Sequence, residues 1–303
     1  MTVVYVGSLT GDDERRSHLY EGAICVLPAC PEGRELAGFA ASMLEEAFAP
    51  YDPRKAQYSM PVEDFVARFA PVKPAFIHDP RTMGLLADLV TAWGCDPDET
   101  YVDVPRLRGV TSDAYLTSGV GYAHHPHRDT WYSAPLAQIN WWLPIYPYAA
   151  ESSMDFHPRY WAEGVANGSA EFDYYEWNAV GRREAASHVK SDTRKQPKAE
   201  EPLELEPAIR FVCSVGEAIG FSAAQLHSTV PNTSGSARFS IDFRTVNLSD
   251  LRERRGGPNV DSRPKGTSLR DFRRASDLAP MPDEIVAMYD TGRPADGDLV
   301  FVP

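Results

Sequence analysis

Three side chains in this sequence could bind one metal ion together. His127 and Asp129 are separated by a single residue, so in an extended segment both face the same side of the chain. His227 follows a strand-like run much later and precedes a turn rich in Pro, Asn, Ser and Gly. Two imidazoles and one carboxylate on one face of a metal are the ligand set of non-heme Fe(II) oxygenases, which leaves coordination positions open.

An arginine on a predicted strand could hold a co-substrate for such a metal. Arg238 lies 11 residues after His227. A 2-oxo acid could occupy two open metal positions and O2 the third, and a distal carboxylate would find a bidentate partner in arginine. Ser240 lies on the same strand face and could share this carboxylate. Arg244 is a competing candidate, which a surface salt bridge would also explain, and we favour Arg238.

A second run, AQINWWLPIY, alternates in a similar way. Gln138, Asn140 and Trp142 share one face, and Ile139, Trp141 and Leu143 share the other. Polar groups at alternate positions of an otherwise apolar strand predict the inner wall of a site, where they would contact the co-substrate or the substrate. The alternative is a pair of buried amides that neighbouring backbone satisfies.

These motifs resemble the phytanoyl-CoA dioxygenase-like family of Fe(II)/2-oxoglutarate-dependent oxygenases. That family shows His-x-Asp, Gly-Asp/Glu before an apolar strand, a second His, an Asn-containing turn and an Arg. The corresponding residues here are His127-Arg128-Asp129, Gly216-Glu217, His227, Asn232 and Arg238. The phrase HRDTWYSAPLAQINWWLPI is also similar to oxygenases of the streptomycin-cluster type in actinobacteria.

The resemblance implies an enzyme with Fe(II), 2-oxoglutarate and O2. His127, Asp129 and His227 would be the catalytic metal ligands, Arg238 would hold the distal carboxylate, and Thr229 would supply a helping hydroxyl. The expected reaction is hydroxylation of a small polar molecule in secondary metabolism, with succinate and CO2 as co-products. Asp129 stands where related halogenases have a small residue, which favours hydroxylation, desaturation or ring formation over halogenation. We expect substrate contacts from the neighbouring aromatic residues Trp131, Tyr132 and Trp142.

The elements that must position these residues read as helices first and strands later. Apolar spacings of three and four predict helices over 33–48, 62–69 and 82–94. Runs rich in β-branched and aromatic residues predict strands at 101–105, 113–118, 137–146, 208–215, 217–221 and 237–246. This order indicates one mainly β domain over 1–303 with N-terminal helices. The resemblance implies a double-stranded β-helix core of the jelly-roll or cupin-like kind.

Within this domain, we assign four segments. Residues 1–100 would form helical support, and 101–250 would form the core. The core is interrupted by an insert at 149–206, rich in charges, Tyr and Trp, which could act as a lid and in which His157 and His188 are read as surface residues. Residues 251–303 would form a C-terminal extension whose basic stretch, 252–274, is read as a surface segment.

Composition excludes several classes of protein. The 303 residues carry a formal net charge of −13, which disfavours nucleic acid as a partner. No apolar run approaches the ~18 residues of a membrane span. The first residues lack the pattern of a signal peptide, so we expect a cytoplasmic protein with four reduced cysteines. No pattern indicates an oligomeric state.

Two other classes of function stay open. One is a different metal-dependent cupin-type enzyme, such as an isomerase or a 2-oxoglutarate-independent dioxygenase. The other is a non-catalytic metabolite-binding protein. Acidity and the aromatic insert fit a polar small-molecule substrate, including a cationic one such as an amino acid, aminoglycoside or sugar derivative. A zinc site at His124 and His125 would lack nearby cysteine ligands.

Overall fold

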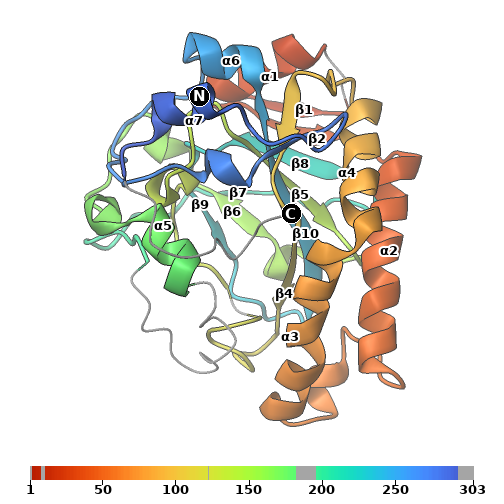
Figure 1. The fold of residues 1–303 in the computed structure, drawn as a ribbon. Helices are drawn as coiled ribbons and strands as arrows, with labels where there is room; N and C mark the ends of the chain where they lie inside the picture. Colours follow the sequence, from red (N-terminus) through yellow and green to blue (C-terminus); the bar gives the residue numbers. More distant parts are fainter. Residues whose placement is uncertain (1, 8–10, 122, 182–195, 293–303) are drawn as a thin grey trace.

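A computed structural model describes residues 2–7, 11–121, 123–181 and 196–292 (Figure 1). It shows a mixed α/β architecture with two sheets, a large one that has helices on one face and a second, smaller one. In the described part of the chain, no helix is both long and apolar enough to cross a membrane.

The large sheet has eight strands arranged around one long central strand, β10 (Arg238–Asn247). On one side β10 pairs with β5, and on the other it pairs with β4 and then β3. All neighbouring strands are antiparallel except β1 and β2, which are parallel. The other strands of this sheet are β1 (Val4–Val6), β2 (Ile24–Leu27), β3 (Thr100–Val102), β4 (Arg106–Val110), β5 (Ile139–Pro144), β8 (Ala218–Ser222) and β11 (Arg273–Arg274).

The small sheet consists of β7 (Ile209–Arg210), β6 (Met154–Phe156) and β9 (His227–Thr229), in that order. Both pairings are antiparallel. An isolated antiparallel bridge joins His127 to His227 and so brings the His-x-Asp segment beside β9. Because β6 lies inside 149–206, the first part of the predicted insert belongs to a sheet.

Three helices cover one face of the large sheet (Figure 1). They are α2 (Pro31–Phe48), α3 (Val62–His78) and α4 (Pro80–Ala92), so the predicted helices are confirmed and α3 is longer than expected. The apolar face of β10 packs against them: the Phe239 ring lies 5.3 Å from Phe69 and 6.4 Å from Phe48, between ring centroids. Three further helices are α1 (Asp12–Tyr20), α6 (Leu248–Glu253) and α7 (Asp283–Tyr289).

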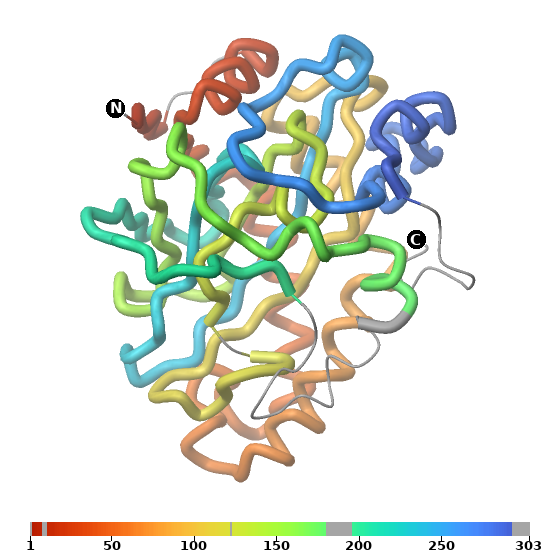
Figure 2. Tube along the Cα trace, turned by 90° about the vertical axis from the view of Figure 1, so that its left-hand side faces the viewer, coloured from red at the N-terminus to blue at the C-terminus, as the bar shows by residue number. Residues whose placement is uncertain are grey.

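Another described part of the insert, around residues 172–174, lies beside the C-terminal extension around residue 265 (Figure 2). The Lys265 amide donates to the Phe172 carbonyl at 2.9 Å, and the Tyr174 amide donates to the Lys265 carbonyl at 3.1 Å. The insert contains the single turn α5 (Tyr174–Glu176) and the π-helix Trp177–Gly181. The expectation that 252–274 is only a surface segment is wrong in part, since β11 joins the large sheet beside β3.

Several sequence expectations differ from the structure. The N-terminal third also contains β1 and β2, which are too short to show a period. Residues 113–118 form no strand, because Asp113 and Ala114 adopt positive φ angles of 57° and 55°. The run 208–215 contributes only the two residues of β7. Strand β4 was not predicted, because two of the five residues in its sequence, RLRGV, are arginines.

We predict that Phe239→Ala lowers the free energy of unfolding by about 3–5 kcal/mol, because it opens a cavity between β10 and the helices. Urea denaturation would measure the loss. Val212→Ala is the matched control, since Val212 is 58% exposed and should change stability little. Equal effects of the two substitutions would contradict this description of the core.

Candidate active site

Two histidines meet through a pair of backbone hydrogen bonds. The His127 amide donates to the His227 carbonyl at 2.9 Å, and the His227 amide donates to the His127 carbonyl at 3.0 Å. The Thr229 amide continues the pairing by donating to the His124 carbonyl at 3.0 Å. Directly opposed residues of an antiparallel pair project to the same side, and the two imidazole centroids are 4.4 Å apart.

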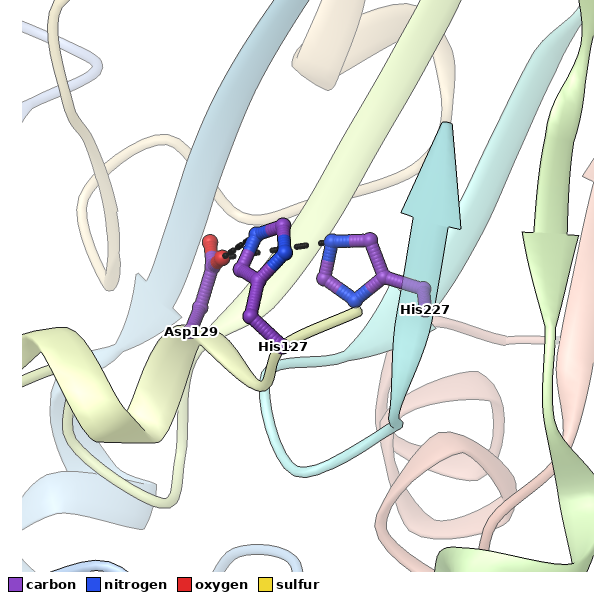
Figure 3. A group of neighbouring side chains, drawn as sticks. All are labelled: His127, Asp129 and His227. Carbon is purple, nitrogen blue, oxygen red and sulfur yellow. Dashed lines mark ion pairs between the residues drawn. The ribbon is translucent and has the colours of Figure 1, made fainter. Parts of the chain in front are cut away.

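Asp129 completes a group of three (Figure 3). It begins the 3-10 turn Asp129–Tyr132, and its Oδ1 lies 3.5 Å from His127 Nε2 and 4.0 Å from His227 Nε2. One ligand atom from each residue falls within 4.8 Å of the others, so the group could hold a metal ion. The structure therefore brings together the three residues predicted as ligands.

Both histidines carry the tautomer that metal binding requires. His127 Nδ1 lies 2.7 Å from the His125 carbonyl, and His227 Nδ1 lies 3.1 Å from the Gln225 carbonyl. A carbonyl can only accept, so these contacts favour a proton on each Nδ1, and each Nε2 is then the nitrogen that can bind a metal beside Asp129.

The protonation states favour a cation at this point. Burial, and next the nearness of the His127 imidazole, lower the pKa of His227 to about 3. Burial raises the pKa of Asp129, but the adjacent His127 and His227 outweigh it and bring that pKa below its ordinary value. Near neutral pH, His227 is neutral and Asp129 is ionised, which are the ligand forms that bind metals.

Arg244 fixes the carboxylate of Asp129. Its Nε and Nη2 each lie 3.3 Å from Asp129 Oδ2, and Gln138 Nε2 donates to the same oxygen at 3.4 Å. Arg244 Nη1 also contacts the carboxylates of Asp103 and Asp242, at 3.5 Å and 3.3 Å. Oδ2 is thus held by protein donors, and Oδ1 is left facing the histidines.

The middle residue of His-x-Asp anchors the loop. Arg128 is 1% exposed and donates to the carbonyls of Ala224 at 2.5 Å and Tyr160 at 2.5 Å. Its Nε also binds Asp261 at 3.1 Å, and Asp261 accepts a hydrogen bond from Trp131 Nε1 at 2.7 Å. The C-terminal extension therefore holds the loop that carries two ligands. The sequence did not predict the contact between Arg128 and Asp261. The alternation of side chains in an extended segment does place Arg128 on the side opposite to His127 and Asp129.

A cavity of about 520 Å³ surrounds the three residues. The structure places Trp131 outside it, fully buried in a separate cluster with Tyr160, Val165 and Leu226. Ser240 is buried and is not among the residues that line the cavity. The other predicted site residues all line it: His127, Asp129, Tyr132, Gln138, Asn140, Trp142, His227, Thr229 and Arg238.

Arg238 is a buried cation with open hydrogen-bonding capacity. It is 5% exposed, and its Nε and Nη1 have no hydrogen-bond partner among the described residues. Its Cζ lies 5.2 Å from the Trp142 ring centroid, and burial lowers its pKa to about 10. Ser240 Oγ and Asn140 Nδ2 also lack partners within the described ranges, although Asn140 Oδ1 accepts from Gln138 Nε2 at 2.8 Å.

The insert contributes to the cavity and holds a buried histidine. Phe172, Tyr174, Trp177 and Gln196 line the cavity. The expectation that His157 is a surface residue is wrong, because it is 2% exposed and its Nε2 lies 3.0 Å from Ser228 Oγ. His188 lies outside the described residues, as does the rest of 182–195.

Comparisons with known proteins give distant structural similarity only. No family model and no curated protein matches the chain. EvdO2 from Micromonospora carbonacea var. aurantiaca is 12% identical with a TM-score of 0.45, over 78% of this chain and 91% of that chain. The epimerase SnoN, solved in complex with Fe3+, alpha ketoglutarate and nogalamycin RO, is 13% identical with a TM-score of 0.42, over 89% and 97%. AviO1 from Streptomyces viridochromogenes Tue57 is 13% identical with a TM-score of 0.39, over 79% and 97%. These values assign neither a family nor an activity to the chain.

We predict that Asp129→Asn abolishes high-affinity binding of a divalent metal, because Asp129 is the anionic member of the ligand group found among the described residues. Calorimetric titration with Co(II) would measure the affinity. Asp242→Asn is the matched control, since Asp242 lines the same cavity but pairs with Arg108 and Arg244. Loss of binding in both variants, or in neither, would contradict the assigned ligand set.

The lowered pKa of His227 predicts acid sensitivity of the metal-free protein. In the unfolded chain His227 becomes protonated as the pH falls below its ordinary pKa of 6.5. In the folded protein it stays neutral until the pH approaches about 3. Stability is therefore lost as pH falls through this window, by about 2 kcal/mol from this residue between about pH 7 and about pH 5. Urea unfolding at both pH values measures it. His227→Gln should flatten the dependence, and an unchanged slope would contradict the assignment.

Proposed function

We propose that the chain is an Fe(II)/2-oxoglutarate-dependent oxygenase that hydroxylates a small molecule, with succinate and CO2 as co-products. The observation that carries the proposal is a group of two histidines and one aspartate in the same cavity as a buried arginine, two of whose nitrogens lack a partner among the described residues. The histidine and carboxylate donors suit Fe(II) with open positions.

The residues present fit 2-oxoglutarate. A buried charge that lacks a partner costs several kcal/mol, and Arg238 has two guanidinium nitrogens without partners within the described ranges. A carboxylate would supply the missing acceptor, since a guanidinium binds a carboxylate in a bidentate arrangement through either of its two N–H edges. Ser240 Oγ, unpartnered among the described residues and on the same strand face, could donate a further hydrogen bond.

Each side chain then has a distinct role. Metal and co-substrate, when bound, supply the activation of O2 and the oxidation of a substrate C–H bond. Arg238, whose guanidinium lies over the Trp142 ring, would hold the distal carboxylate, and Thr229 lines the same cavity. Arg244 and Gln138 orient Asp129. Because Asp129 fills the third protein position, no site is left there for a halide, which supports hydroxylation over halogenation.

The same proposal extends to fold and context. We infer that the two sheets, which enclose the site, form a double-stranded β-helix within a single domain. The phytanoyl-CoA dioxygenase-like motifs support membership of that family, and the HRDTWYSAPLAQINWWLPI phrase supports a role in secondary metabolism. A cytoplasmic location remains our expectation.

The first test is binding of 2-oxoglutarate to the Mn(II)-loaded protein. We predict that Arg238→Ala weakens this binding about 30-fold or more, since it removes one partner of a buried charge pair. Arg252→Ala, at an exposed position, is the matched control and should bind normally.

Two outcomes would count against the proposal. Unaltered protein that binds metal but not 2-oxoglutarate would favour a different cupin-type enzyme. Normal binding by the Arg238→Ala variant would remove Arg238 from the co-substrate site. A screen for succinate release against small metabolites separates a catalyst from a metabolite-binding protein.

A further inference from the structure

The charges of the cavity differ in sign from the charge of the whole chain. Its described lining has more basic than acidic side chains, although the full sequence carries −13. The basic residues are Lys73, Arg106, Arg108, Arg238 and Arg244, and the acidic residues are Asp103, Asp129 and Asp242. A divalent metal would add two positive charges and the two carboxylates of 2-oxoglutarate would cancel them, so the basic excess would remain when both are bound.

Each of these carboxylates is already engaged by arginine. Asp103 accepts from Arg106 Nη1 at 2.5 Å and also contacts Arg244. Asp242 accepts from Arg108 Nε at 2.6 Å and lies 3.3 Å from Arg244. Asp129 faces the histidines and Arg244. In the described part of the lining, therefore, every carboxylate already has a cationic partner, which leaves poor provision for an ammonium group.

A row of aromatic rings runs from the metal group to the insert. The ring centroids of His127 and Tyr132 are 5.6 Å apart, those of Tyr132 and Phe172 are 5.2 Å apart, and those of Phe172 and Trp177 are 5.9 Å apart. All four residues line the cavity. Trp177 begins a π-helix, a feature frequent at functional sites.

Two buried polar atoms of cavity-lining residues have no hydrogen-bond partner among the described residues. Asn140 is 5% exposed, and its Nδ2 has no hydrogen-bond partner among the described residues. Ser268 Oγ is also buried and likewise has no hydrogen-bond partner within the described ranges. An amide N–H and a hydroxyl both donate to a hydroxyl or carbonyl oxygen.

We propose that the substrate is a neutral, oxygen-bearing molecule with a planar ring, which lies against Tyr132, Phe172 and Trp177. Asn140 and Ser268 donate to its oxygen atoms, and the arginine-rich lining repels an amino cation. This inference rests on the proposed function and narrows its substrate class. It replaces the expectation, drawn from acidic composition, that a cation fits. The cavity volume of about 520 Å³ lies in the range for such ligands.

The test compares two ring probes on Mn(II)- and 2-oxoglutarate-loaded protein without O2. Calorimetry should show that 2-naphthol binds, and that 2-naphthylmethylamine, as its ammonium ion, binds at least about 10-fold more weakly. Phe172→Leu and Trp177→Ala should each weaken 2-naphthol binding about 10-fold. Tyr51→Ala, which alters an aromatic residue that is 40% exposed and outside the cavity lining, is the control and should have no effect.

Equal or tighter binding of the amine, no binding of 2-naphthol, or unchanged affinity in both cavity variants would overturn the inference. A repeat titration without metal and 2-oxoglutarate separates the two proposals. If 2-oxoglutarate fails to bind while 2-naphthol still depends on Phe172 and Trp177, the proposed oxygenase function fails and the ring site stands. If 2-oxoglutarate binds and 2-naphthol does not, only the substrate inference fails.

Discussion

The site depends on two backbone hydrogen bonds between His127 and His227, residues 100 positions apart in the chain. This pairing sets both imidazoles on one side, and the alternation of an extended segment then brings Asp129 to the same point. Backbone carbonyls select the tautomer of each ring. Arg128 points to the other side of the segment, where its hydrogen bonds to Asp261 and to backbone carbonyls hold the loop, so His127 and Asp129 stay directed into the cavity. A metal ion would therefore meet donors that the fold has already oriented.

The polar face of β10 divides the cavity into two functional ends. Arg238 and Arg244 lie on this face, six residues and about 20 Å apart along the strand. Arg244 is surrounded by the carboxylates of Asp103, Asp129 and Asp242, so it orients protein groups. Arg238 lies over Trp142, and two of its guanidinium nitrogens have no partner in the described part of the chain. The same residue type thus has a structural task at one end and a ligand-binding task, as we propose, at the other.

Sequence alone could predict the features that local rules decide. Three- and four-residue spacing predicted α2 and α4, and residue type with spacing predicted His127, Asp129 and His227 as one group. It could not predict the bond from Arg128 to Asp261, because nothing local marks two residues 133 positions apart as partners. Short strands such as β1 and β2 have no measurable period. Net composition allowed a cationic substrate, but composition averages over the whole chain, whereas the described cavity lining has more basic than acidic side chains.

The central claim is that one cavity binds Fe(II) and 2-oxoglutarate together, and visible absorption of the anaerobic protein tests it most directly. The account predicts a weak metal-to-ligand charge-transfer band when both Fe(II) and 2-oxoglutarate are present, and no band when either is omitted. Protein that has bound Fe(II) stoichiometrically but shows no such band with saturating 2-oxoglutarate would contradict the account.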